Sequence, residues 1–146
     1  MGEVISINIS QEKGTKKKPL DAARFRVDHG LVGDAHAGQW HRQVSLLGEE
    51  SINKMRDLGA TDLKYGDFAE NITTRGINLI SFPIGTKFRI GETVQELTQI
   101  GKKCHTGCEI AAIVGDCIMP KEGIFTKVIK GGIVKVGDLI EVYEES

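Results

Sequence analysis

The feature that most restricts this chain is the way glycine divides it into short segments. The sequence has 18 glycines and only 3 prolines. Glycine at short intervals is typical of tight turns that join short strands. Because a succession of short strands and turns builds a sandwich or a barrel, we expect a mostly β protein.

Apolar segments of strand length lie between these turns. Ile5, Ile7 and Ile9 alternate with polar residues, which predicts a half-buried strand at the N-terminus. Further strands are predicted in succession at residues 24–27, 43–47, 87–90, 94–100, 124–129 and 139–142. The lysine-rich run 11–19 favours a solvated hairpin loop, with phosphate binding as the alternative.

Two short helices are predicted beside the strands. Residues 49–58 carry Ile52, Met55 and Leu58 on one stripe, and glutamates occupy the first turn. Residues 108–114 form a shorter apolar face. If this second helix forms, Cys108 lies in its first turn, where the helix dipole stabilises a thiolate.

Length and charge bound the class of protein. A chain of 146 residues suits one domain, spanning residues 1–146. The formal net charge of -1 gives no general attraction to nucleic acid, and no apolar run is long enough to span a membrane. The 3 cysteines are an odd number without a secretory segment, which favours free thiols in a cytoplasmic protein.

Reactive residue types gather in one segment near Cys104 and Cys108. Lys102, Lys103 and His105 flank the two thiols. Neighbouring cations favour the thiolate, which is the form that acts as a nucleophile or as a ligand for soft metals. The cluster therefore predicts sulfur chemistry or metal ligation.

Two other polar segments are bounded by glycine. The first, residues 33–43, holds Asp34, His36, His41 and Arg42, residue types that bind metals or anions, perform acid–base chemistry, or form a hydrogen-bonded structural turn. The second, residues 66–76, includes Asn71 and two carboxylates and suits either substrate contact or the satisfaction of backbone donors.

A zinc site is an alternative for the cysteines. Cys104, His105, Cys108 and one of His36 or His41 complete a familiar ligand set. The second ligand pair at short spacing that zinc sites usually have is missing. We therefore rank zinc below the other chemistry open to these thiols.

Taken in order, these motifs resemble the MOSC domain family, named for the C-terminal part of molybdenum cofactor sulfurase. The resemblance runs from about Val4 to Val142 and is closest to small stand-alone bacterial members. The motifs that carry it are Gly33-Asp34-x-His36-x-Gly38, Arg42-Gln43-Val44-Ser45-Leu46, Gly66-Asp67-Phe68-x-Glu70-Asn71-Ile72, Gly85-x-x-Phe88-x-Ile90-Gly91 and the cysteine cluster.

The resemblance implies a single-domain, barrel-like β fold with two or three short helices. It also implies a pocket whose cysteine carries sulfur or ligates the molybdenum of a molybdopterin cofactor. In larger relatives a pyridoxal phosphate-dependent domain liberates the sulfur. Here pyridoxal phosphate would belong to a partner, a cysteine desulfurase-like sulfur donor.

By motif position Cys108 matches the family cysteine, as catalytic thiol and as molybdenum ligand, and Cys104 is the second choice. Cofactor-binding residues are predicted on the same basis: Asp34, His36, Arg42, Asn71, Lys102, Lys103 and His105. Cys117 is either a second sulfur-accepting thiol or a small buried residue.

Three functions remain open. The first is maturation or sulfuration of the molybdenum cofactor, in which the chain acts as a sulfur carrier or sulfur transferase for a molybdoenzyme or molybdopterin biosynthesis proteins. The second is a non-catalytic carrier of intact cofactor. The third is a small molybdenum-dependent oxidoreductase component that reduces N-hydroxylated compounds.

Overall fold

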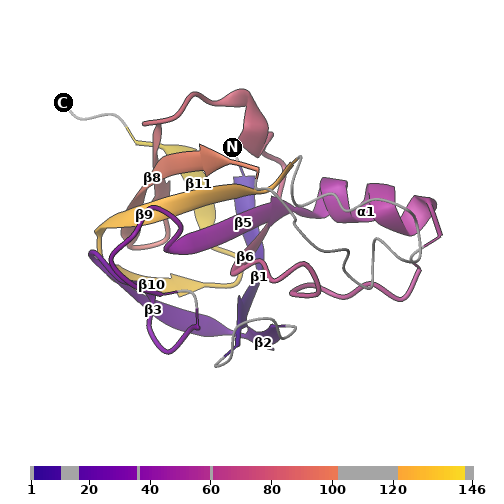
Figure 1. Cartoon of the computed structure of the whole chain (residues 1–146), viewed down its shortest axis with the longest axis horizontal. Coiled ribbons are helices and arrows are strands. Elements are labelled where there is room, and N and C mark those ends of the chain that lie inside the picture. The colour runs from indigo at the N-terminus through magenta and orange to yellow at the C-terminus, as the bar shows by residue number, and fades with distance from the viewer. Residues whose placement is uncertain (1, 11–16, 36, 60, 102–121, 144–146) are drawn as a thin grey trace.

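The computed structural model describes residues 2–10, 17–35, 37–59, 61–101 and 122–143. The predicted helix at 108–114 and the cysteine cluster lie outside these residues. Within them the chain is mostly β, with one α-helix and one short 3-10 helix, as predicted. Figure 1 shows the helix extending from one side of a curved sheet.

Seven strands form a closed barrel. They follow the order β11 (Leu139–Val142), β7 (Lys87–Ile90), β8 (Thr93–Ile100), β9 (Ile124–Lys130), β5 (Val44–Gly48), β6 (Ile72–Arg75) and β1 (Gly2–Ile9). The pairing of β1 with β11 closes the barrel, and β2 (Lys18–Leu20) pairs with the last three residues of β1. All neighbours are antiparallel except β5 and β6, which are parallel. A closed barrel leaves few exposed strand edges.

A second, three-stranded sheet covers one side of the barrel. It contains β10 (Gly132–Lys135), β3 (Ala22–Arg26) and β4 (Gly30–Leu31). Phe25, Leu31 and Val134 from this sheet are fully buried and belong to the same apolar cluster as the barrel interior. The two sheets therefore share one core.

Helix α1 (Glu49–Asp57) connects the parallel strands β5 and β6. Parallel strands need such a crossover because a tight hairpin cannot join them. Ile52 and Met55 are buried against Leu47, Phe68 and Phe125 in a second apolar cluster, as the helical stripe predicts. Leu58, the third residue of the predicted stripe, is 65% exposed and follows the last residue of the helix, Asp57.

Strand β1 is present as predicted, but its faces do not alternate regularly. The pairing with β6 shifts between Val4 and Ser6, which marks a β-bulge. Beyond the bulge Ile7 is fully buried in the same cluster as Val4, while Ile5 and Ile9 are only partly buried. The bulge thus brings Val4 and Ile7 into one core although three positions separate them.

The prediction of a solvated loop is wrong for Lys17. Its side chain is 0% exposed and forms an ion pair with Asp34. The next residues form strand β2 rather than loop. A lysine is buried this fully only when a partner compensates for the loss of hydration.

Candidate functional site

The described residues include three of the predicted site residues. Asp34, Arg42 and Asn71 lie in the described part of the chain. The others lie outside it: His36, Lys102, Lys103, Cys104, His105 and Cys108, together with Cys117. The roles predicted for these residues stay predictions.

The two ends of the cysteine-containing segment are fixed to the barrel. The backbone N–H of Gly101, just after β8, donates to the carbonyl of Gly123, just before β9, at 2.6 Å. The Glu122 carboxylate accepts hydrogen bonds from the Ser51 hydroxyl at 2.8 Å and from the Lys54 ammonium at 2.9 Å. The segment therefore begins and ends where β8 and β9 meet, beside helix α1.

Arg42 lies at this end of the barrel, in the residues that lead into β5. Its Nε donates to Oε1 of Gln99 at 3.0 Å. Its guanidinium carbon lies 5.9 Å from the centre of the Trp40 ring and 5.5 Å from that of Phe125, distances typical of cation–π contacts. No described residue accepts a hydrogen bond from its two terminal amino groups. A guanidinium held in this way presents a fork of donors suited to a phosphate or carboxylate.

Gln99 connects Arg42 to the base of the cysteine segment. The same Oε1 that receives the Arg42 bond also lies 2.9 Å from Nε2 of His41, and the Gln99 amide nitrogen donates to the Gly101 carbonyl at 2.6 Å. The Thr98 hydroxyl donates to the backbone carbonyls of His41 and Phe125. This end of β8 thus holds the Trp40–Arg42 segment by side-chain bonds.

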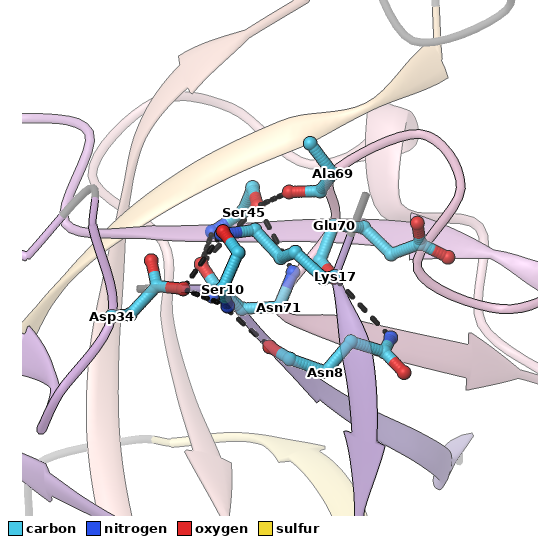
Figure 2. A network of polar contacts seen from close by, with 8 residues as sticks. All are labelled: Asn8, Ser10, Lys17, Asp34, Ser45, Ala69, Glu70 and Asn71. Atoms are coloured by element: carbon cyan, nitrogen blue, oxygen red, sulfur yellow. Dashed lines mark hydrogen bonds and ion pairs between the residues drawn. The ribbon is translucent and has the colours of Figure 1, made fainter. Parts of the chain in front are cut away.

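Asp34 belongs to a buried ion pair beside Ser10, the residue that follows β1. Its Oδ1 lies 2.6 Å from Nζ of Lys17 and accepts a hydrogen bond from the backbone N–H of Ser10 at 3.1 Å. Lys17 also donates to the Ser10 hydroxyl at 3.3 Å. Figure 2 shows these groups in one polar network with Asn71. The arrangement agrees with the structural-turn alternative for Asp34.

Asn71 connects two strands of the barrel within the same network. Its Oδ1 accepts from the backbone N–H of Ser45 at 3.0 Å, and its Nδ2 donates to the carbonyl of Asn8 at 3.3 Å (Figure 2). Both bonds reach backbone groups of β5 and β1, and Asn71 is fully buried. Its amide therefore satisfies backbone groups, which is one of the two roles predicted for residues 66–76.

Glu70 is the most unusual titratable group of the described site. It is fully buried, and one oxygen, Oε2, accepts a hydrogen bond from the Thr73 hydroxyl at 2.8 Å. No described residue forms a hydrogen bond with Oε1. Burial raises the pKa of Glu70 from 4.5 to about 7, although nearby backbone amides of Gly66, Phe68 and Glu70 and the Thr73 hydroxyl oppose the rise.

Metal ligands are not grouped within the described part of the chain. No three His, Cys, Asp or Glu residues converge there to hold an ion. Because all 3 cysteines lie outside this part, both the zinc and the molybdenum hypotheses stay predictions. The donor set of Arg42 fits the phosphate of a pterin cofactor.

Sequence reasoning missed three residues of this region. Lys17 is hidden in a lysine-rich run, and nothing in the sequence distinguishes it from its neighbours. Gln99 lies in a predicted strand, where a glutamine gives no signal. Glu70 was within the second polar segment, but only the packing around it shows how fully it is buried.

A seven-stranded closed barrel with one crossover helix and a small covering sheet defines a single-domain β-barrel protein. The match to protein families identifies which one. Residues 33–141 match the MOSC domain, so the chain belongs to the MOSC domain family. This family is associated with molybdenum cofactor binding and sulfuration.

Solved structures show the same fold. The YuaD protein from Bacillus subtilis superposes with a TM-score of 0.82 at 19% identity, covering 100% of this chain and 98% of that one. YiiM from Geobacillus stearothermophilus gives 0.74 at 16% identity, with coverage of 99% and 76%. YiiM from Escherichia coli gives 0.71 at 19% identity, with coverage of 100% and 71%.

No curated protein gives a significant sequence match to this chain. Among the described helices, none is both long and apolar enough to cross a membrane.

Proposed function

We propose that this protein acts in maturation of the molybdenum cofactor, carrying sulfur on Cys108 or holding molybdenum through it. The observation that supports this most directly is the position of Arg42 in a MOSC domain. Its guanidinium fork, whose terminal amino groups bond to no described residue, lies where the segment bearing Cys104 and Cys108 leaves the barrel. An anionic, sulfur-rich cofactor needs both kinds of group, a basic anchor and a soft thiolate.

Most of the predicted cofactor-binding residues have a role in this proposal. Arg42 binds the phosphate of the cofactor, and the positive charges of Lys102, Lys103 and His105 add to it. Asp34 and Asn71 act indirectly, because their bonds hold the loops around β1 and β5 in place. When bound, the cofactor would supply a molybdenum centre that accepts sulfur ligands.

Sulfur loading of Cys108 is a transfer without net oxidation. The Cys108 thiolate attacks the outer sulfur of a persulfide on the donor enzyme, and the donor cysteine leaves as a thiolate. The neighbouring cations favour the thiolate that attacks. The donor is a cysteine desulfurase, which carries its own pyridoxal phosphate.

The proposal is tested by incubating the purified chain with a cysteine desulfurase and cysteine under anaerobic conditions. Intact-mass and peptide analysis should find one added sulfur atom on Cys108 in the wild type and none there in Cys108→Ser. Cys117→Ser is the matched control and should still accept sulfur on Cys108. Sulfur on Cys104 alone would transfer the role to Cys104.

The molybdenum arm uses protein purified anaerobically from a host supplied with molybdate. Metal and pterin analysis should find molybdenum with pterin, lost in Arg42→Gln and in Cys108→Ser. Cofactor bound with unchanged sulfur content, without any sulfur on Cys108, would favour the non-catalytic carrier. A chain that takes up neither sulfur nor cofactor refutes the proposal.

A further inference from the structure

One glutamine, Gln99, makes three side-chain contacts at the point where Arg42 meets the cysteine segment. Its Oε1 accepts from Nε of Arg42 at 3.0 Å and lies 2.9 Å from Nε2 of His41, and its Nε2 donates to the carbonyl of Gly101 at 2.6 Å. Arginine Nε is always a donor, so the atom facing it must be the amide oxygen. The orientation of the amide is therefore fixed, and Nε2 of His41 must be its donor.

These contacts determine the orientation of the Arg42 guanidinium. The Nε bond prevents rotation of the guanidinium about its long axis, and the rings of Trp40 and Phe125 contact the group at 5.9 and 5.5 Å. The two terminal amino groups then point in a fixed direction. Prior fixing of a binding group lowers the entropy that a ligand must remove on binding.

The position of Gln99 depends on an irregularity in β8. The pairing with β9 shifts between Leu97 and Gln99, so that one extra residue stands opposite Phe125. In a regular strand Gln99 would share the face of Leu97, which is fully buried in the barrel core. A β-bulge re-aims the side chains beyond it, and here it brings the Gln99 amide to Arg42 and His41.

We propose that Gln99 is a positioning residue that holds Arg42 in its anion-binding orientation and links an anion on Arg42 to Gly101, the last described residue before the cysteine segment. This inference rests on the role given to Arg42 in the proposed function. An oxyanion on the Arg42 fork would strengthen the bond network through Gln99. By linkage, any such coupling acts equally in both directions.

Trp40 makes the proposal measurable, because it is the one tryptophan of the chain and it contacts the Arg42 guanidinium. The probe is inorganic phosphate, titrated while Trp40 fluorescence is recorded. The second readout is the rate at which iodoacetamide alkylates Cys104 and Cys108, mapped by peptide mass, without phosphate and at saturation. The wild type should show a saturable change in fluorescence and a phosphate-dependent change in alkylation.

Two variants separate the contact of Gln99 with Arg42 from its contact with Gly101. Gln99→Leu removes both and should raise the phosphate midpoint about tenfold, the factor expected for loss of one hydrogen bond to a charged group. Gln99→Glu keeps the acceptor for Arg42 but removes the donor to Gly101. It should preserve a slowly exchanging Arg42 Nε–H signal in NMR spectra while abolishing the effect of phosphate on alkylation. Gln39→Leu, an exposed glutamine beside Trp40, is the matched control.

A double-mutant cycle distinguishes positioning from a general structural effect. If Gln99 acts through Arg42, Gln99→Leu should change the phosphate response of the wild type but not that of Arg42→Gln. Equal effects in both backgrounds, or no response of wild-type Trp40 to phosphate, overturn the inference. If Gln99→Leu fails to fold, Gln99→Glu alone carries the test, and alkylation that still responds to phosphate in that variant refutes it.

Failure here and failure of the proposed function are distinguishable. Sulfur loading of Cys108 by a desulfurase requires neither phosphate nor Gln99. A chain that accepts sulfur but does not bind phosphate at Arg42 refutes the inference and leaves the sulfur-carrier proposal standing.

Discussion

Glu70 offers a test of the buried polar network through the pH dependence of stability. Its pKa is about 7 in the folded protein against 4.5 for an ordinary glutamate, because burial disfavours the charged form. The folded state therefore binds the proton more tightly than the unfolded state. Between pH 4.5 and about 7 the contribution of Glu70 to the free energy of unfolding falls as pH rises.

The magnitude follows from the same two values. The interval from 4.5 to about 7, at ~1.36 kcal/mol for each pH unit, corresponds to about 3 kcal/mol of stability present at pH 4 and lost by pH 8. Glu70→Gln cannot ionise, so this part of the pH dependence should disappear. The variant should gain stability relative to the wild type as pH rises from 5 to 8.

Urea denaturation at pH 5, 6, 7 and 8, followed by far-UV circular dichroism, measures this difference. The two proteins are compared by the slope of the free energy of unfolding against pH. The stability at a single pH is less informative, because the glutamine amide itself changes the contacts with the backbone donors near the carboxyl group. Glu141→Gln is the control, since Glu141 is exposed on β11. Parallel curves for the wild type and Glu70→Gln would show that Glu70 does not titrate in this range, and the argument from burial would be wrong.

Three further substitutions test the packing around this network. Lys17→Met should lower the free energy of unfolding by about 3–5 kcal/mol, because it leaves the Asp34 carboxylate buried without its 2.6 Å partner. In urea denaturation, the double variant with Asp34→Asn should recover much of this loss. Gly66→Ala should lower the melting temperature far more than Gly85→Ala: the two glycines have φ of +94° and +97°, but only at Gly66 would a Cβ lie 2.6 Å from a backbone oxygen. Asn71→Ala should cost about 3 kcal/mol, since it strips a partner from two buried backbone groups, and a loss below about 1 kcal/mol would contradict the bonds described.

The strand pattern of the sequence was sufficient to predict most of the barrel. The strands at 87–90 and 139–142 match β7 and β11 residue for residue, because each is short, carries apolar residues and follows a glycine turn. Strands β2, β4, β6 and β10 were not predicted. In β6 the residues Thr73 and Thr74 are fully buried, so that their polar side chains conceal a core strand.

The site was less predictable than the fold because it depends on contacts between distant segments. Arg42 could be chosen from its motif, but its partner Gln99 lies 57 positions away. The burial of Lys17 likewise depends on Asp34, which lies 17 positions away. A local sequence pattern predicts which residue types a site contains. Which of these residues contact one another depends on the closure of the barrel.

Two of the register shifts in the barrel, one in β1 and one before Gln99 in β8, show how irregularity places polar groups. In β1 the shift between Val4 and Ser6 lets Val4 and Ile7 share the core while Asn8 forms side-chain bonds with Ser6 and Thr73. In β8 the shift before Gln99 leaves Leu97 in the core and places the Gln99 side chain against Arg42. A strict alternation of apolar and polar residues would have placed these side chains on the wrong face. Bulges are inserted where a strand must serve a core on one part of its length and a polar site on the next. The cysteine segment begins directly beyond the bulge at Gln99. The irregularity that orients Arg42 therefore also lies where that segment leaves the barrel.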